Sequence, residues 1–201
     1  MNLLLAILAV SAAIWLRPWR ALHSEGPPWL WLAAGSVLPL LWGLDRFTAI
    51  SILPPMSGAA LLVLLAGWPL AVLAFVPAAV VLVVAGDVGW AEALQRLVWL
   101  GVVPATLVLG IGAATRRWLP NHLFVYILGR GFFGTFVATM LASAAALWLD
   151  GGFTTAAGDP LVARLLLCFT EALLTGFVTG GLVAFRPQCL ATYTDHLYLP
   201  R

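Results

Sequence analysis

Residues 120–150, PNHLFVYILGRGFFGTFVATMLASAAALWLD, decide the fold of this chain. The apolar stretch is longer than the roughly 20 residues with which an α-helix crosses a bilayer. It nevertheless carries one full charge, Arg130. Four small residues recur at every fourth position and so share one helix face: Gly131, Thr135, Thr139 and Ser143. Membrane helices approach each other closely on such faces, so the stretch predicts a membrane helix packed on another helix.

The composition places the chain among the membrane proteins. Of its 201 residues, 63% are hydrophobic and only 9% are charged, and the mean hydropathy is +1.03. A soluble domain has about 25% charged residues. The net charge is +2, and all ten basic residues are arginines without a dense cluster. We therefore expect the lipid bilayer as a partner and no nucleic acid.

The apolar segments predict an all-α fold, a polytopic membrane helix bundle that forms a single transmembrane domain over residues 1–201. About seven transmembrane helices are expected, at residues 2–16, 29–44, 56–66, 70–85, 96–114, 121–149 and 161–185. Pro54 and Pro55 interrupt the entry to the third helix, because proline lacks an N–H and disfavours helix in the preceding residue. Irregular backbone at membrane depth is tolerated where protein buries it or where it lines a cavity. Pro54, Pro55 and Met56 are therefore a possible cavity wall, and a plain loop at the membrane surface is the alternative.

The arginines predict the orientation of the bundle. With seven crossings, one set of loops carries Arg17, Arg20, Arg116, Arg117, Arg186 and Arg201. The other set carries fewer arginines, diluted by acidic residues. The positive-inside rule then places the N-terminus outside and the C-terminus in the cytoplasm. If residues 47–66 re-entered instead of crossing, six crossings would remain and the N-terminus would move inside.

Two charged residues lie well away from the ends of predicted membrane helices, Arg130 and Glu171. At 1.5 Å per residue they lie about 14 Å and about 21 Å from the cytoplasmic ends of their helices, a gap that an extended arginine spans. Gly176 and Gly180 form a GxxxG step beside Glu171, which favours close packing of the two helices. We therefore expect an intramembrane ion pair. It either fixes helix packing or acts as a gate or proton-linked element of a permeation path; the alternative is that the two residues do not touch.

Enzyme chemistry has no support in the sequence. There is no glycine-rich phosphate loop, no GxSxG and no HExxH, and no nucleophile–base pair is evident. We expect no catalytic residues and no cofactor, and any ATP-driven step would need another subunit.

Four stretches carry a resemblance to a known family: GWPLA from residue 67, PNHLFVYILGRGFFG from residue 120, EALLTG from residue 171 and FRPQCLATYTDHLYLP from residue 185. In these the chain resembles the membrane permease components of energy-coupling-factor ABC transporters, the CbiM-like group linked to cobalt and nickel uptake, in a divergent proteobacterial branch. The resemblance implies a substrate-binding subunit in the bacterial inner (plasma) membrane. Its implied partners are a transmembrane coupling subunit and ATPase subunits, and its implied substrate is a divalent metal ion.

The chain departs from the metal-binding pattern of that family. The pattern uses the N-terminal amine, a histidine at the second residue and an internal histidine, whereas this chain has Asn2 and, at the internal position, Pro54-Pro55. Imidazoles suit nickel and similar metals, so their loss leaves only weak candidate donors in Met1, Asn2 and Met56. The alternative function is a non-transporting membrane accessory or assembly protein that has lost the metal site.

Overall fold

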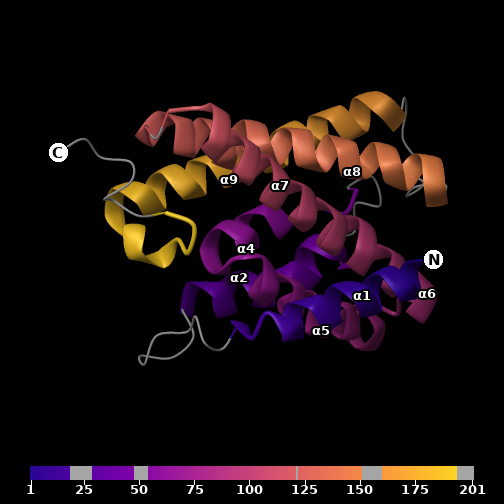
Figure 1. Ribbon diagram of the computed structural model, residues 1–201. Helices are drawn as coiled ribbons and strands as arrows, with labels where there is room; N and C mark the ends of the chain where they lie inside the picture. Colours follow the sequence, from indigo (N-terminus) through magenta and orange to yellow (C-terminus); the bar gives the residue numbers. More distant parts are fainter. Residues whose placement is uncertain (19–28, 48–53, 121, 151–159, 194–201) are drawn as a thin grey trace.

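The computed structural model describes residues 1–18, 29–47, 54–120, 122–150 and 160–193, and every regular element in these ranges is a helix (Figure 1). In chain order the elements are α1 (Asn2–Trp15), α2 (Trp29–Trp42), α3 (Leu44–Phe47), α4 (Ala59–Ala66), α5 (Trp68–Ala85), α6 (Trp90–Arg96), η2 (Leu97–Val102), α7 (Val103–Trp118), η3 (Val125–Phe133), α8 (Gly134–Asp150), α9 (Pro160–Phe185) and η4 (Pro187–Cys189). The segments η2 and η3 are π-helical.

Within the described ranges, four helical stretches are long and apolar enough to cross a membrane. They are Trp68–Ala85, Trp90–Trp118, Val125–Leu149 and Val162–Phe185. The apolar helices α1 and α2 have 14 residues each, and α4 has eight. At 1.5 Å per residue, 14 residues reach about 21 Å, less than the hydrocarbon thickness of about 30 Å. The chain is thus an all-helical membrane protein in its described part, with four full-length candidate spans.

The fifth expected helix begins earlier than the sequence indicated. The prediction started it at residue 96, but α6, η2 and α7 run on from one another over the 29 residues Trp90–Trp118. Arg96 looked like a helix end because it is charged. It lies inside the helix and is only 2% exposed, because two carboxylates neutralise its guanidinium.

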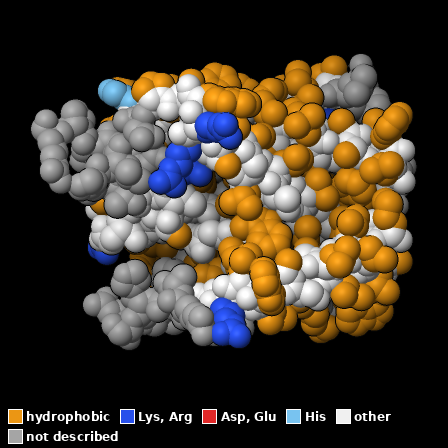
Figure 2. Space-filling model, viewed as in Figure 1, with side chains coloured by type: hydrophobic (Ala, Val, Ile, Leu, Met, Phe, Trp, Pro, Cys, Tyr) orange, Lys and Arg blue, Asp and Glu red, His pale blue; other side chains and the backbone are white. Residues whose placement is uncertain are grey.

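The helices form two groups that pack on each other. Figure 1 shows α7, α8 and α9 together on one side and α1, α2, α4, α5 and α6 on the other, with the start of α1 and the end of α9 at opposite ends. The main core lies around α5 and contains the fully buried Trp42, Phe75, Leu82 and Val98. Large apolar side chains also cover much of the outer surface, as suits contact with lipid (Figure 2).

Candidate functional site: a buried carboxylate at the start of α4

The irregular segment 54–58 leads into α4 within the protein interior. Pro55 and Ser57 are buried, and Gly58 has a φ of 65°, in the left-handed region that glycine adopts without strain. A Cβ atom added to Gly58 would lie 2.9 Å from Cδ1 of Leu41. Both the backbone conformation and the space therefore require glycine at the residue that precedes α4.

Glu171 of α9 binds the backbone of this segment. Its Oε2 accepts a hydrogen bond of 3.1 Å from the N–H of Ser57, and its Oε1 accepts one of 2.9 Å from the N–H of Gly58. The glutamate is 5% exposed. The first N–H groups of a helix lack partners within the helix and carry partial positive charge. The carboxylate thus caps α4 from a helix more than 100 residues away in sequence.

Three further hydrogen bonds involve the segment. The indole N–H of Trp42 donates to the carbonyl of Ser57 at 2.8 Å, and the N–H of Met56 donates to the carbonyl of Leu41 at 3.0 Å. The hydroxyl of Ser57 accepts from the N–H of Ala59 at 3.1 Å. These bonds explain how non-helical backbone is accommodated in an apolar interior.

The expected ion pair between Arg130 and Glu171 does not form between these two described residues. Both oxygens of Glu171 face the start of α4, while Nη1 of Arg130 donates to the carbonyl of Thr192 at 3.4 Å. The guanidinium of Arg130 also lies 5.7 Å from the centre of the Tyr126 ring. The depth estimate from the sequence could match the two residues in height. It did not give the side of each helix on which they lie. It also did not show that a non-helical segment would offer Glu171 two backbone N–H donors.

The expected small-residue positions lie between η3–α8 and α9. A Cβ on Gly131 would meet Cβ of Thr179 at 3.3 Å, and one on Gly176 would meet Cβ of Phe132 at 3.3 Å. A Cβ on Gly180 would lie 3.6 Å from Ile127. Thr135 and Thr139 are buried, and their hydroxyls donate to the carbonyls of Gly131 and Thr135 in the same helical stretch. The two helices therefore pack backbone to backbone beside Glu171.

The possible metal donors are not gathered into a recognisable centre. Met1 is 65% exposed, Met56 is half-buried in segment 54–58, and Asn2 begins α1. Within the described ranges, no group of three or more His, Cys, Asp and Glu side chains is placed to hold a metal ion. Pro54, Pro55 and Met56 line neither of the two cavities described below. Pro54, Pro55 and Met56 instead belong to the segment whose backbone binds Glu171.

A charge network that the sequence prediction missed joins α3 to α6. Arg96 donates to both oxygens of Asp45 at 2.7 Å, to Glu92 at 2.5 Å and to the carbonyl of Trp42. Arg46 donates to Glu92 at 3.0 Å. Burial raises the pKa of Asp45, but the hydrogen bond and charge of Arg96 outweigh it, so its pKa lies below the ordinary value. The i, i+4 spacing of Glu92 and Arg96 was a visible signal, although it could not reveal the link to Asp45.

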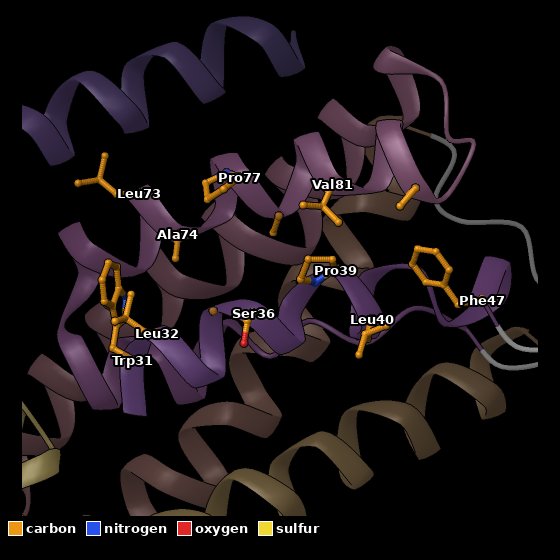
Figure 3. Close-up of a pocket in the computed structure, with 13 residues that line it drawn as sticks. Trp31, Leu32, Ser36, Pro39, Leu40, Phe47, Leu73, Ala74, Pro77 and Val81 are labelled. Carbon is orange, nitrogen blue, oxygen red and sulfur yellow. The ribbon is translucent and has the colours of Figure 1, made fainter. Parts of the chain in front are cut away.

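An apolar groove of about 610 Å³ separates α2 from α5 (Figure 3). Figure 3 shows Pro39 of α2 and Pro77 of α5 on its two sides, with Trp31 at one end and Phe47 at the other. Each proline removes one backbone N–H from the interior of its helix. Among the described residues that line the groove, one carries a hydroxyl, Ser36, which donates to the carbonyl of Ala33.

Comparison with known proteins identifies no relative: no family model, no curated protein and no solved structure matches the chain.

Proposed function

We propose that the chain is a permease or substrate-binding subunit of an energy-coupling-factor type ABC transporter in the bacterial inner membrane. The proposal joins the resemblance in the four sequence stretches above to one structural observation. That observation is the broken entry to α4, held by the buried carboxylate of Glu171. Cobalt and nickel ions are the first substrates to test.

Interrupted helices support this class of function. In transporters, substrate and ion sites commonly form where a helix is broken near the middle of the bilayer, because free backbone groups and half-helix ends are available there. An ionisable residue within the membrane is likewise a functional candidate, since its burial is costly without a role or a partner. Segment 54–58 and Glu171 bring both features to one place.

Seven crossings with the N-terminus outside remain our topology. The opposite placement of the start of α1 and the end of α9 supports an odd number of passes (Figure 1). The third pass then consists of residues 54–66, of which only Ala59–Ala66 are helical.

A second candidate is a non-transporting accessory or assembly protein. Two observations favour it: the polar groups of segment 54–58 described above already have hydrogen-bond partners within the protein, and the described ranges contain no metal-ligand cluster. In this function Glu171 only stabilises the fold.

Metal accumulation distinguishes the two candidates. Cells that lack the chain are grown under metal limitation and supplied with the wild type, with Glu171→Gln or with Thr170→Ala, an exposed neighbour in α9. Cellular cobalt and nickel are then measured by elemental analysis, with membrane abundance of each variant as the control. Transport predicts that the wild type and Thr170→Ala raise one metal above the deletion strain and that Glu171→Gln does not.

The purified protein provides a second readout. Calorimetric titration in detergent with Co, Ni, Cu and Zn ions should detect one metal at micromolar affinity or tighter. If no metal accumulates in cells and none binds, the transition-metal proposal is wrong and the accessory function is favoured.

A further inference from the structure

A cavity of about 410 Å³ lies where the end of α7 meets η3. Three of its lining residues are arginines, Arg116, Arg117 and Arg130. The two other described lining residues, Leu109 and Ala113, are apolar, so no acidic side chain of the described ranges contributes to the wall. The four ion pairs found among the described residues all belong to Arg46 or Arg96. Three positive charges therefore share one cavity without a described carboxylate to balance them.

Arg130 is held toward this cavity by its backbone and by Gly112. It lies in π-helical η3, whose wider turn shifts side chains relative to an α-helix, and π-helical segments often occur at functional sites. A Cβ on Gly112 would lie 2.6 Å from Nη2 and 2.9 Å from Nε of Arg130, so the guanidinium rests directly on the backbone of α7. Nε is buried without a hydrogen-bond partner, and Nη1 makes only the long bond to Thr192. The guanidinium thus keeps most of its donor capacity for another acceptor.

The apolar part of the wall indicates what kind of anion fits. Leu109, Ala113 and Arg116 or Arg117 follow one another at three- and four-residue steps, so they lie along one face of α7. Leu109 is 46% exposed, and the arginines are exposed in the last turn of the helix. The face therefore changes from basic to apolar toward the interior of the candidate span. Figure 2 shows most basic side chains on its face gathered toward the end at which α9 finishes.

We propose that this cavity binds the phosphodiester headgroup of an anionic phospholipid, with Arg116, Arg117 and Arg130 contacting the phosphate and Leu109 and Ala113 contacting the acyl chain. Guanidinium groups bind phosphate oxygens in bidentate fashion. Basic pockets between membrane helices on the cytoplasmic side suit such headgroups. Free inorganic phosphate is also an anion that guanidinium groups bind, but it has no apolar group to contact Leu109 and Ala113. The inference does not depend on the proposed transport function.

Thermal unfolding of the purified, delipidated protein in a neutral detergent tests the proposal. Phosphatidylglycerol, phosphatidylcholine with the same acyl chains, and inorganic phosphate are titrated separately, and tryptophan fluorescence reports the unfolding temperature. We expect phosphatidylglycerol alone to raise the unfolding temperature with a saturating dose response. Equal stabilisation by phosphatidylcholine would overturn headgroup recognition, and equal stabilisation by inorganic phosphate would overturn the lipid as the ligand.

Two pairs of variants locate the effect. Gly112→Ala displaces the Arg130 guanidinium without changing any charge, whereas Gly110→Ala has no atom within 4 Å of its new Cβ. The double variant Arg116→Gln/Arg117→Gln removes charge from the cavity, whereas Arg17→Gln removes charge from an exposed site that does not line it.

The cavity variants should raise the half-saturating phosphatidylglycerol concentration about tenfold, the equivalent of about 1.4 kcal/mol. The controls should leave that concentration unchanged. If a control shifts it as much as its partner does, binding is not at this cavity. Native mass spectrometry of the same samples counts bound phosphatidylglycerol, which keeps the test valid where a variant alters stability by itself.

Discussion

Replacing Glu171 tests whether the start of α4 depends on a carboxylate from α9. Glu171→Ala leaves the N–H groups of Ser57 and Gly58 without their acceptors, which now lie at 3.1 Å and 2.9 Å. A buried donor that loses its partner costs about 1–3 kcal/mol, so two donors set an upper range of about 2–6 kcal/mol. The free energy that one side-chain hydrogen bond contributes within a membrane protein averages about 0.6 kcal/mol and reaches at most about 1.7 kcal/mol. We therefore expect Glu171→Ala to lower the free energy of unfolding by about 2–3 kcal/mol.

Glu171→Gln should cost about half as much, because an amide offers one acceptor oxygen for two donors. The measurement is reversible unfolding in mixed detergent micelles, with Thr170→Ala as the control. Thr170 is exposed and makes only a bond to the carbonyl of Leu166 within its own helix, so its loss should stay within about 0.5 kcal/mol.

Hydrogen exchange gives the local readout. Peptides that cover residues 54–66 should exchange faster in Glu171→Ala, while peptides from α5 keep their wild-type protection. The capping role is refuted if Glu171→Ala unfolds within about 0.5 kcal/mol of wild type, or if its exchange rises equally across the chain.

Four further predictions concern other contacts. Because Arg130 and Glu171 do not pair, the losses of unfolding free energy in Arg130→Ala and Glu171→Ala should add to within about 0.5 kcal/mol in the double variant. A larger coupling energy would show that the two residues do form an ion pair. Gly131→Ala and Gly176→Ala should each cost about 1–3 kcal/mol in the same unfolding assay through overpacking, whereas Gly181→Ala, with nothing within 4 Å of its new Cβ, should cost nothing; equal losses would contradict the close packing. Arg96→Gln should destabilise by about 1.5–3 kcal/mol, because it removes the charge-assisted hydrogen bonds to Asp45 and Glu92 and leaves only the exposed Arg46 beside these carboxylates; Arg46→Gln should cost at most about 1 kcal/mol. The pKa of Asp45 in the folded protein is depressed below its unfolded value of 3.8, so its ionised form stabilises the fold. This stability is fully present above pH 3.8 and is lost as the pH falls through the lower folded pKa. The free energy of unfolding, measured from pH 6 downward, should show this loss in the control Asp87→Asn and not in Asp45→Asn.

The fold could be predicted as far as it depends on local sequence. Most expected helices reappear in the described ranges with shifted ends, as α5 does at Trp68–Ala85 against the expected 70–85. The break at Pro54-Pro55 also reappears, because proline acts on its own backbone and on that of its neighbour. Arg96 was misplaced because a charge usually marks a helix end, and its neutralising partner Asp45 is 51 residues away.

By itself, the sequence determined that this chain belongs in a membrane and that small-residue faces lie on its last two long helices. Both properties depend on one helix at a time, because the free energy of transfer into lipid adds up over the residues of one segment and the face on which small residues lie follows from their spacing in that segment. Only the tertiary structure decided what the intramembrane charges contact. The bond between Glu171 and Ser57 joins residues 114 apart, and the cavity around Arg130 depends on its position against Gly112. Such contacts require the rotation and depth of several helices at once, which one-dimensional spacing does not specify.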